Sequence, residues 1–188
     1  MTSPVDLPNN GPEAREQAFD ALFRRHYRAL CRFATRMLGG EAEAEEVVQE
    51  LFLFVWERHD VISDASPSRA YLYRAVHNAA LNRIRHQRVE RRWADGEGHP
   101  VGQATDAPVD TMFEEQELAR AVRQAIAQLP ERTRLVYTLS RQDQLTYAEI
   151  AATLGISVKT VETQMTRAFR RLRIALGPFL AGILLVVR

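Results

Sequence analysis

TYAEIAATLGISVKTVETQMTRAFRRLR (residues 146–173) contains two short helical patterns separated by a glycine. Thr146 and Glu149 have the spacing of a capping box, in which each side chain bonds a backbone N–H at the start of a helix. Gly155 predicts a tight turn with a positive φ angle. Ser157 predicts the N-cap of the second helix. The segment therefore predicts two capped helices joined by a glycine turn.

The second helix of this segment is amphipathic. It carries five cationic side chains and one acid, Glu162, and its apolar residues recur at the spacing of one buried face. That face is expected to contain Val158, Val161, Met165, Ala168 or Phe169, and Leu172. With the small Ala151 at the crossing, the core shared by the two helices is expected to contain Ile150, Leu154, Ile156, Val161 and Met165.

This arrangement predicts a helix-turn-helix, whose second helix enters the major groove of DNA. Its exposed face carries side chains that can bond base edges and phosphates. We expect Arg167 to match the two acceptors of guanine, and the arginines from residue 170 onward to hold phosphates. The expected DNA-binding residues are Lys159, Thr160, Thr163, Gln164, Thr166, Arg167, Arg170 and Arg171. A basic helix can also serve an acidic protein or a membrane, and an αα-hairpin that only packs is the alternative.

Charge is segregated along the 188-residue chain, although its formal net charge is only +1. Residues 69–92 contain seven arginines and one acid, whereas residues 94–117 contain seven acids and no Lys or Arg. The composition is 46% hydrophobic, so most of the chain can bury a core. These blocks predict a basic surface for nucleic acid followed by an acidic linker.

Helical spacing predicts an all-α chain of two small helical domains joined by a flexible acidic linker, because no strand pattern stands out. The expected helices span about residues 19–38, 43–58, 67–92, 111–129, 130–141, 147–154 and 158–173. Gly39 and Gly40 stop the first of them. The expected segments are a disordered lead (1–15), a first domain (16–93), the linker (94–113), a second domain (114–176) and an apolar tail (177–188).

Two helices of the first domain have unusual faces. The helix from Pro67, with Ser66 as N-cap, carries amides and guanidiniums within roughly 120° of each other, which suits bases together with phosphates. That stripe consists of Arg74, Asn78, Asn82, Arg85, Arg88 and Arg92. A solvated basic face is the alternative.

The helix at 43–58 has apolar residues over about 200° of its circumference, wider than the stripe of an ordinary surface helix. These residues are Val47, Val48, Leu51, Phe52, Phe54, Val55 and Trp56. Either the helix lies at the centre of its domain, or part of the stripe docks a partner.

The sequence shows no nucleophile–base pair and no metal-ligand cluster, so we expect no enzyme, no metal, no cofactor and no small-molecule substrate. The single cysteine, Cys31, excludes an internal disulfide and is expected to be a buried small side chain. The N-terminus lacks the pattern of a signal peptide, and we expect a cytoplasmic protein. The apolar tail is shorter than the ~20 residues of a membrane span. We expect it to pack on the preceding domain or a partner, with a membrane anchor as the alternative.

Three blocks of the sequence occur in an order that is specific to one protein family. They are EAEEVVQELFLFVWE (43–57), SRAYLYRAVHNAALNRIRHQR (68–88) and LPERTRLVYTLSRQDQLTYAEIAATLGISVKTVETQMTRAFRRLR (129–173). In this order, with the linker between the second and third, the chain resembles the extracytoplasmic-function (ECF) sigma factors of bacterial RNA polymerase. The resemblance covers about residues 19–92 and 114–173.

The resemblance implies a transcription initiation factor that binds core RNA polymerase, directs it to specific promoters and assists DNA melting. The implied partners are the clamp helices of the largest polymerase subunit, the flap region of the second, promoter DNA and an anti-sigma factor. Together with Phe54 from the wide stripe, the expected polymerase-binding residues are Glu46, Val47, Gln49, Glu50, Phe52, Phe54 and Trp56.

The resemblance also distributes DNA contacts between the two domains. The loop at 61–69 and the following helix match the part that reads and melts the minus-ten element. Together with the stripe, the expected residues there are Arg69, Arg74, Asn78, Asn82, Arg85 and Arg88. Thr163, Thr166 and Arg167 match base-contacting positions for the minus-thirty-five element. The family usually has Asp where this chain has Asn82, which removes a charge beside the DNA.

The resemblance gives the acidic linker a role as well, because in the family it threads the catalytic cleft and the RNA exit channel. The run at 94–117, which includes the linker and has seven acids and no Lys or Arg, can occupy such a basic channel as a polyanion mimic. Two other functions stay open. A two-domain repressor or activator would show a sensory pocket or dimer seam, and none is apparent. A sigma mimic that sequesters an anti-sigma factor need not keep both basic faces.

Overall fold

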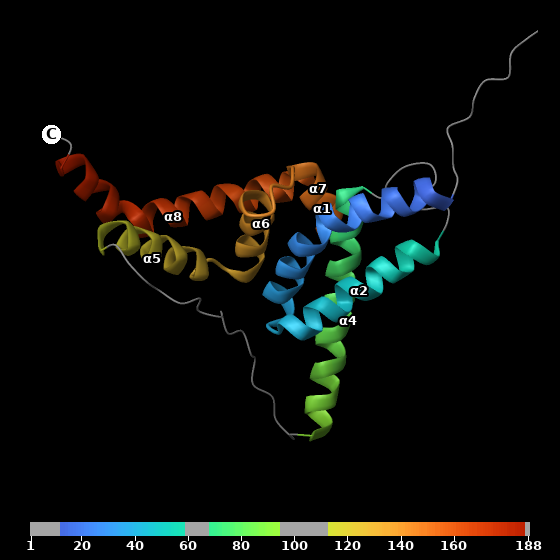
Figure 1. Ribbon diagram of the computed structural model, residues 1–188. Coiled ribbons are helices and arrows are strands. Elements are labelled where there is room, and N and C mark those ends of the chain that lie inside the picture. Colours follow the sequence, from blue (N-terminus) through green and yellow to red (C-terminus); the bar gives the residue numbers. More distant parts are fainter. Residues whose placement is uncertain (1–11, 59–67, 95–112, 187–188) are drawn as a thin grey trace, which may run out of the picture. The chain divides into compact units, whose positions relative to one another are not determined.

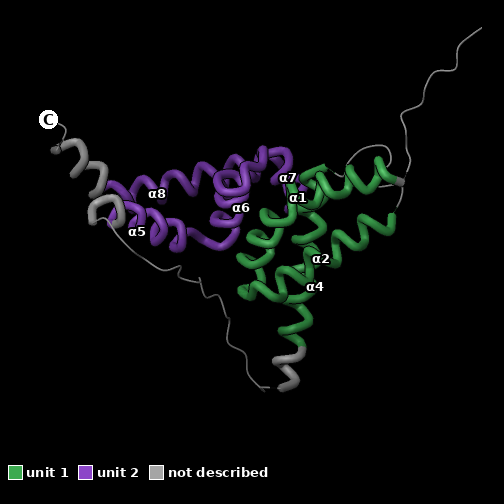
Figure 2. The backbone as a smooth tube through the Cα atoms, in the orientation of Figure 1, with its two compact units in different colours: residues 1–100 green, residues 101–188 purple. Residues whose placement is uncertain are grey.

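The computed structural model describes residues 12–58, 68–94 and 113–186, and all regular structure within these ranges is helical. The chain divides into two compact units, residues 1–100 and 101–188 (Figure 2). The predicted all-α architecture is therefore confirmed. Residues 1–11 of the predicted lead, nearly all of the linker and residues 61–67 of the loop predicted at 61–69 lie outside the described residues. Residues 12–15, predicted to belong to the disordered lead, are helical, and the first helix begins at Pro12 instead of about residue 19. The exact domain bounds stay predictions.

Unit 1 consists of α1 (Pro12–Leu38), α2 (Glu41–Glu57) and α4 (Arg69–Ala94), each of which packs against the other two (Figure 1). Gly39 ends α1 with a φ of 84°, and its N–H donates to the Thr35 carbonyl at 2.8 Å. Because a positive φ suits glycine, the predicted stop is confirmed. The fully buried side chains of this core include Leu30, Phe33, Val48, Val55, Leu72, Tyr73 and Val76.

The wide apolar stripe of α2 is mostly internal. Val47, Val48, Leu51, Phe52 and Val55 are buried between α1 and α4. Phe54 and Trp56, at the two edges of the stripe, remain 40% and 39% exposed. The helix is therefore central to its unit, and the two aromatic edges are left at the surface.

The start of α4 differs from the prediction. The helix begins at Arg69, and the Ser68 hydroxyl accepts a hydrogen bond from the Tyr71 N–H at 3.2 Å. Ser68 therefore takes the capping role that we predicted for Ser66, which lies outside the described residues. Two serines flank the proline in this sequence, and local preference alone does not choose between them.

Unit 2 consists of α5 (Phe113–Ala127), α6 (Glu131–Arg141), α7 (Tyr147–Leu154) and α8 (Val158–Val186), with α8 packed against the other three. Figure 1 shows α5 lying alongside α8. Ala125 and Leu129 are buried against Ala168 and Leu172 in this contact. This packing holds α8 from one side and leaves its opposite face exposed.

The predicted end of α8 at Arg173 is wrong, because the helix continues to Val186. Gly177 and Pro178 lie within it. A proline removes one backbone hydrogen bond but does not always end a helix. Within the described ranges no helix, α8 included, combines the length and the apolar character needed to cross a membrane.

Candidate nucleic-acid interface

Local capping fixes the helix-turn-helix. The Thr146 hydroxyl accepts from the Glu149 N–H at 3.2 Å, and the Glu149 carboxylate accepts from the Thr146 N–H at 2.7 Å. Gly155 has a φ of 65°, and the Ser157 hydroxyl accepts from the Thr160 N–H at 3.1 Å. The caps and the glycine turn predicted for the helix-turn-helix are confirmed, and the Ser157 cap fixes the residue at which α8 starts.

The buried face of α8 largely follows the prediction. Val161, Met165, Ala168 and Leu172 are buried, as is Ile150 of α7. Between the two alternatives at the fourth position, Ala168 is the buried one, whereas Phe169 is exposed beneath the Arg141 guanidinium, 5.1 Å from the ring centroid.

Three apolar positions are less buried than predicted. Val158, expected on the buried face, is 44% exposed, because it lies in the first turn before α8 meets the other helices. Leu154 and Ile156 are only half-buried.

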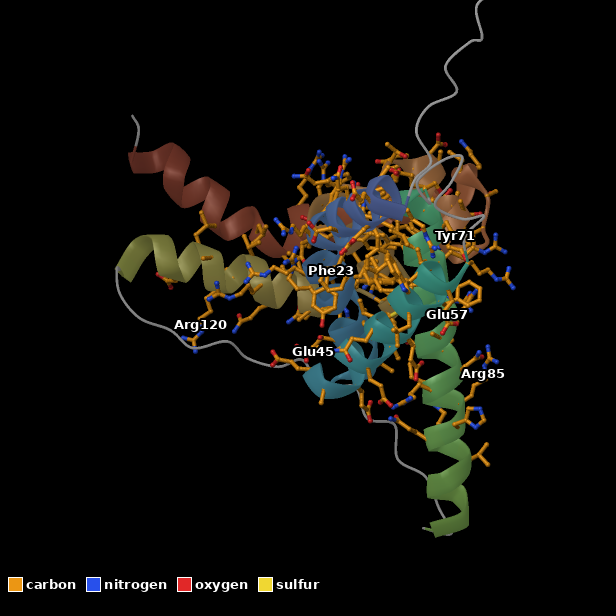
Figure 3. The ribbon with its side chains drawn as sticks, turned by 45° about the vertical axis from the view of Figure 1, so that its right-hand side comes forward. Phe23, Glu45, Glu57, Tyr71, Arg85 and Arg120 are labelled. Carbon is orange, nitrogen blue, oxygen red and sulfur yellow. The ribbon has the colours of Figure 1, made fainter. Side chains whose placement is uncertain are left out.

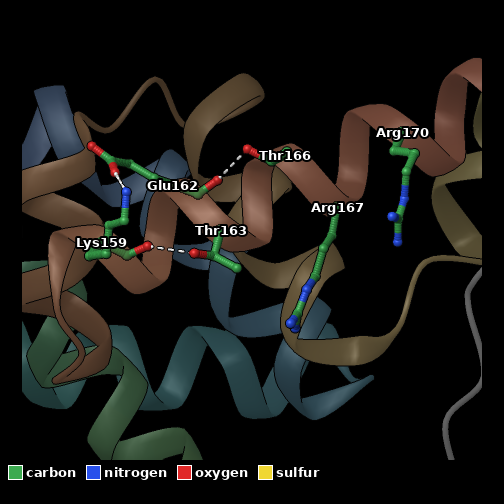
Figure 4. A pocket seen from close by; sticks show the side chains of 6 residues that line it. All are labelled: Lys159, Glu162, Thr163, Thr166, Arg167 and Arg170. Carbon is green, nitrogen blue, oxygen red and sulfur yellow. Dashed lines mark hydrogen bonds and ion pairs between the residues drawn. The ribbon is translucent and has the colours of Figure 1, made fainter.

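The opposite face of α8 forms a shallow groove at the surface (Figure 4). Its lining residues are Lys159, Glu162, Thr163, Thr166, Arg167 and Arg170. Lys159 pairs with Glu162 at 3.4 Å, whereas Arg167 and Arg170 have no ion-pair partner within the described residues. Thr160 and Arg171 are also exposed. Glu162 was not predicted on this face, although its position one turn before Thr166 indicates it.

The two threonines of this groove are bonded to their own helix. The Thr163 hydroxyl donates to the Lys159 carbonyl at 2.9 Å, and the Thr166 hydroxyl donates to the Glu162 carbonyl at 2.9 Å. Both side chains are exposed. The groove therefore presents two cations without ion-pair partners beside two threonines whose hydroxyl protons are already engaged.

Gln164 is less exposed than predicted, and its contact with DNA stays a prediction. It is half-buried, and its side-chain oxygen accepts a hydrogen bond from the Thr133 hydroxyl of α6 at 2.7 Å. Gln164 directly precedes the buried Met165, so it lies at the boundary between the two faces of the helix. Its amide connects α8 to α6.

A second polar face lies along α4. Every described member of the predicted stripe is exposed: Arg74, Asn78, Asn82, Arg85 and Arg88. Arg85, which projects from α4 in Figure 3, donates to the Asn82 side-chain oxygen at 3.0 Å. The Arg92 side chain lies outside the described residues.

Three residues of α4 outside the stripe change the set of residues predicted to contact the minus-ten element. Arg69 is half-buried, with its guanidinium 5.7 Å from the Tyr73 ring centroid, and at ~100° per residue it lies on a different side of the helix from the stripe. The exposed Tyr71 and Val89 share the helical phase of the stripe and were missed. Their spacing from Asn78 and Asn82 could have indicated them, because residues separated by four or seven positions share one face of a helix.

A third surface lies on α2, where Glu46, Gln49 and Glu50 are exposed as predicted. Val47 and Phe52 are buried, so they support this surface from within and do not form it. Leu53, which was not predicted to belong to this surface, is 61% exposed on the same helical face.

Contacts at the rim of this α2 surface involve both aromatic edges and one acid. The guanidiniums of Arg15 and Arg58 lie 4.8 and 4.7 Å from the ring centroids of Trp56 and Phe54. Glu46 forms an ion pair with Arg83 of α4. The surface is therefore acidic and apolar, with cations at its rim.

Buried titratable groups of unit 1 have shifted pKa values. Burial lowers the pKa of His77, and burial together with Arg25 and Arg69 lowers that of His26. Burial raises the pKa of the half-buried Cys31 thiol. No group of three or more His, Cys, Asp or Glu side chains within the described ranges could hold a metal ion.

Two family descriptions match the chain. Sigma-70 region 2 matches residues 22–90, and Sigma-70, region 4 matches residues 119–172. The ECF RNA polymerase sigma factor SigL of Mycobacterium tuberculosis is 34% identical over 171 residues, covering 89% of this chain and 94% of the relative. The chain belongs to the ECF sigma factor family. It is therefore an alternative sigma factor of transcription initiation.

Other relatives agree with this family. The ECF RNA polymerase sigma factor SigW of Bacillus subtilis is 32% identical over 146 residues, covering 73% of this sigma factor and 78% of the relative. CnrH, solved in complex with the cytosolic domain of CnrY, is 28% identical with a TM-score of 0.55, covering 87% of this chain and 90% of its own. The sigma factor RpoE of Bartonella quintana, solved with the anti-sigma factor NepR, has a TM-score of 0.61 at 20% identity, covering 89% and 98%. This last likeness concerns the fold alone.

Proposed function

We propose that this ECF sigma factor binds core RNA polymerase, directs it to promoters with a minus-thirty-five and a minus-ten element, and assists DNA melting. The observation that carries the proposal is that each unit exposes one helical face rich in arginines and uncharged polar side chains, on α8 and on α4. Such faces suit base edges and phosphates together. The factor would act in the cytoplasm, at the nucleoid when bound to polymerase, without catalytic activity of its own.

The face of α8 would contact the minus-thirty-five element. Ser157 fixes the start of the helix, so Lys159, Thr163 and Arg167 lie toward the end that enters the groove. Arg167 has no ion-pair partner in the part of the chain that the structure describes, and it has the planar fork that matches guanine. Arg170 and Arg171 lie further along and would hold phosphates. Gln164 would act indirectly, by fixing the helix against α6.

The stripe of α4 would contact the minus-ten element. Asn78 and Asn82 are flanked by Arg74 and Arg85 on one exposed face. The Arg85–Asn82 hydrogen bond leaves the Asn82 amide N–H groups available as donors. We add the exposed Tyr71 to this contact, because an aromatic ring next to amides can stack on an unpaired base.

The exposed surface of α2 would bind the clamp helices of the polymerase. Leu53 lies among Glu46, Gln49 and Glu50, with Phe54 and Trp56 at its two sides. A partner helix with basic and apolar side chains would complement it. Unit 2 would contact the flap region of the second subunit, and the acidic linker would occupy a basic channel. The two similar solved structures hold partner proteins, one named an anti-sigma factor, which supports an anti-sigma factor as a further partner.

Transcription reconstituted from purified parts tests the proposal. Core polymerase with the wild-type chain should initiate from a subset of a promoter-fragment library, and core alone should not. Arg167→Ala should reduce initiation at those promoters, whereas Arg132→Ala, an exposed arginine at the start of α6, serves as a matched control. Specific DNA binding without core, combined with no transcription in its presence, would contradict the proposal and favour a repressor or activator.

A further inference from the structure

The hydroxyl protons of Thr163 and Thr166 are used in hydrogen bonds within α8, so they are not available to DNA bases. Each hydroxyl donates to the carbonyl four residues earlier at 2.9 Å. A threonine hydroxyl has one proton, so while these bonds persist it cannot donate to a base. Bonds of this kind are a stable option for threonine in a helix, because its oxygen can reach the preceding turn.

This rotamer turns the methyl group outward. In Figure 4 the Thr163 oxygen points back toward Lys159, and its methyl carbon lies on the opposite side. Thr166 follows three residues later and makes the equivalent bond, so the two threonines are neighbours on one helical face. Both line the groove that also contains Arg167 and Arg170.

The major groove of DNA offers one apolar base feature, which is the C5-methyl group of thymine. A threonine methyl makes a favourable apolar contact with it, while an arginine fork beside it matches guanine. We infer that Thr163 and Thr166 read thymine methyl groups in the minus-thirty-five element, next to the guanine that Arg167 reads. This inference rests on the proposed function, because it requires α8 to enter the major groove.

Replacing thymine by deoxyuridine tests the inference with the wild-type protein. Deoxyuridine removes only the C5-methyl, and burial of one methyl corresponds to about fourfold in affinity. We first select the preferred minus-thirty-five sequence with the chain bound to core polymerase, and then replace each thymine in turn. One or two replacements should weaken binding by about fourfold each, and the others should have little effect.

Paired substitutions at each threonine then separate the contribution of the methyl group to DNA binding from that of the hydroxyl group. Thr163→Val and Thr166→Val keep the methyl, so they should keep the preference for thymine and remain sensitive to deoxyuridine. Thr163→Ser and Thr166→Ser lose the methyl, so they should bind about fourfold more weakly and lose that sensitivity. Arg171→Ala is the matched control and should weaken thymine and deoxyuridine sites equally.

Two results would overturn the inference while the proposed function stands. One is specific binding that no deoxyuridine replacement alters. The other is loss of base preference in the valine variants with retention in the serine variants, which would show that the hydroxyl oxygens accept hydrogen bonds from bases. A wild-type chain that selects no sequence with core polymerase would instead refute the proposed function itself.

Discussion

Leu53→Ala should weaken binding to core polymerase without unfolding unit 1. Leu53 is 61% exposed, and full burial of a leucine side chain is worth about 1.5–3 kcal/mol. Burial of the exposed part by a partner would therefore contribute about 1–2 kcal/mol, so that its loss raises Kd about five- to thirtyfold. Alanine is the best helix former, and we expect the unfolding free energy to change by less than about 1 kcal/mol.

The assay is a binding titration of core enzyme, paired with chemical unfolding followed by tryptophan fluorescence. Both tryptophans, Trp56 and Trp93, lie in unit 1, so this fluorescence reports the unit that carries Leu53. Val48→Ala is the matched control, because Val48 is fully buried on the same helix. It should cost about 2 kcal/mol of stability and leave Kd unchanged while the chain is folded. Wild-type affinity of folded Leu53→Ala would remove this face of α2 from the interface.

Three further substitutions or conditions give distinct expected outcomes. Arg167→Ala should cost ~1–3 kcal/mol of binding free energy at the preferred DNA site and relax the preference at one base position. Arg171→Ala should weaken binding to all sequences equally and lower the slope of log affinity against log salt concentration by about one. Binding selection on randomised DNA compares the two variants. Thr133→Val removes the bond to Gln164 and should cost about 1 kcal/mol, measured by circular dichroism during unfolding. Because burial lowers the pKa of His77, the unfolded chain binds more protons, so unit 1 should lose stability as pH falls below about 6.5; His77→Gln should reduce that loss.

The helix-turn-helix could be predicted to the residue, because the bonds that define it are local. Thr146 and Glu149 bond across three residues, as do Ser157 and Thr160. Gly155 adopts the positive φ that its residue type favours. These caps and this turn depend on residues a few positions apart and not on long-range contacts. Three boundaries were wrong. The first helix begins at Pro12, ahead of the apolar spacing that predicted its start at about residue 19. The boundaries at Ser68 and beyond Arg173 fall where the sequence offers a second cap or where a Gly-Pro pair is tolerated within a helix.

The surface residues could be predicted less completely, because packing decides where a face ends. Gln164 and Phe52 lie beside exposed positions on their helices, yet contacts with α6 and α1 bury them in part or fully. Leu53 and Tyr71 were missed for the opposite reason. A search for charges and amides passes over apolar and aromatic side chains, and only their helical phase places them on exposed faces.

The surfaces on α8 and α2 differ in how their charges are compensated, and this difference separates their roles. On α8, Arg167 and Arg170 have no ion-pair partner among the described residues, so they remain available for phosphates and base edges. On α2, Glu46 is paired with Arg83, and arginines lie over both aromatic edges. The charge of Glu46 is thus balanced within the unit, so the apolar area of Leu53 and the two aromatic edges has to supply much of the affinity for a partner. We therefore expect DNA binding at α8 to be dominated by charge and sensitive to salt, and polymerase binding at α2 to depend more on apolar burial, which salt screens little.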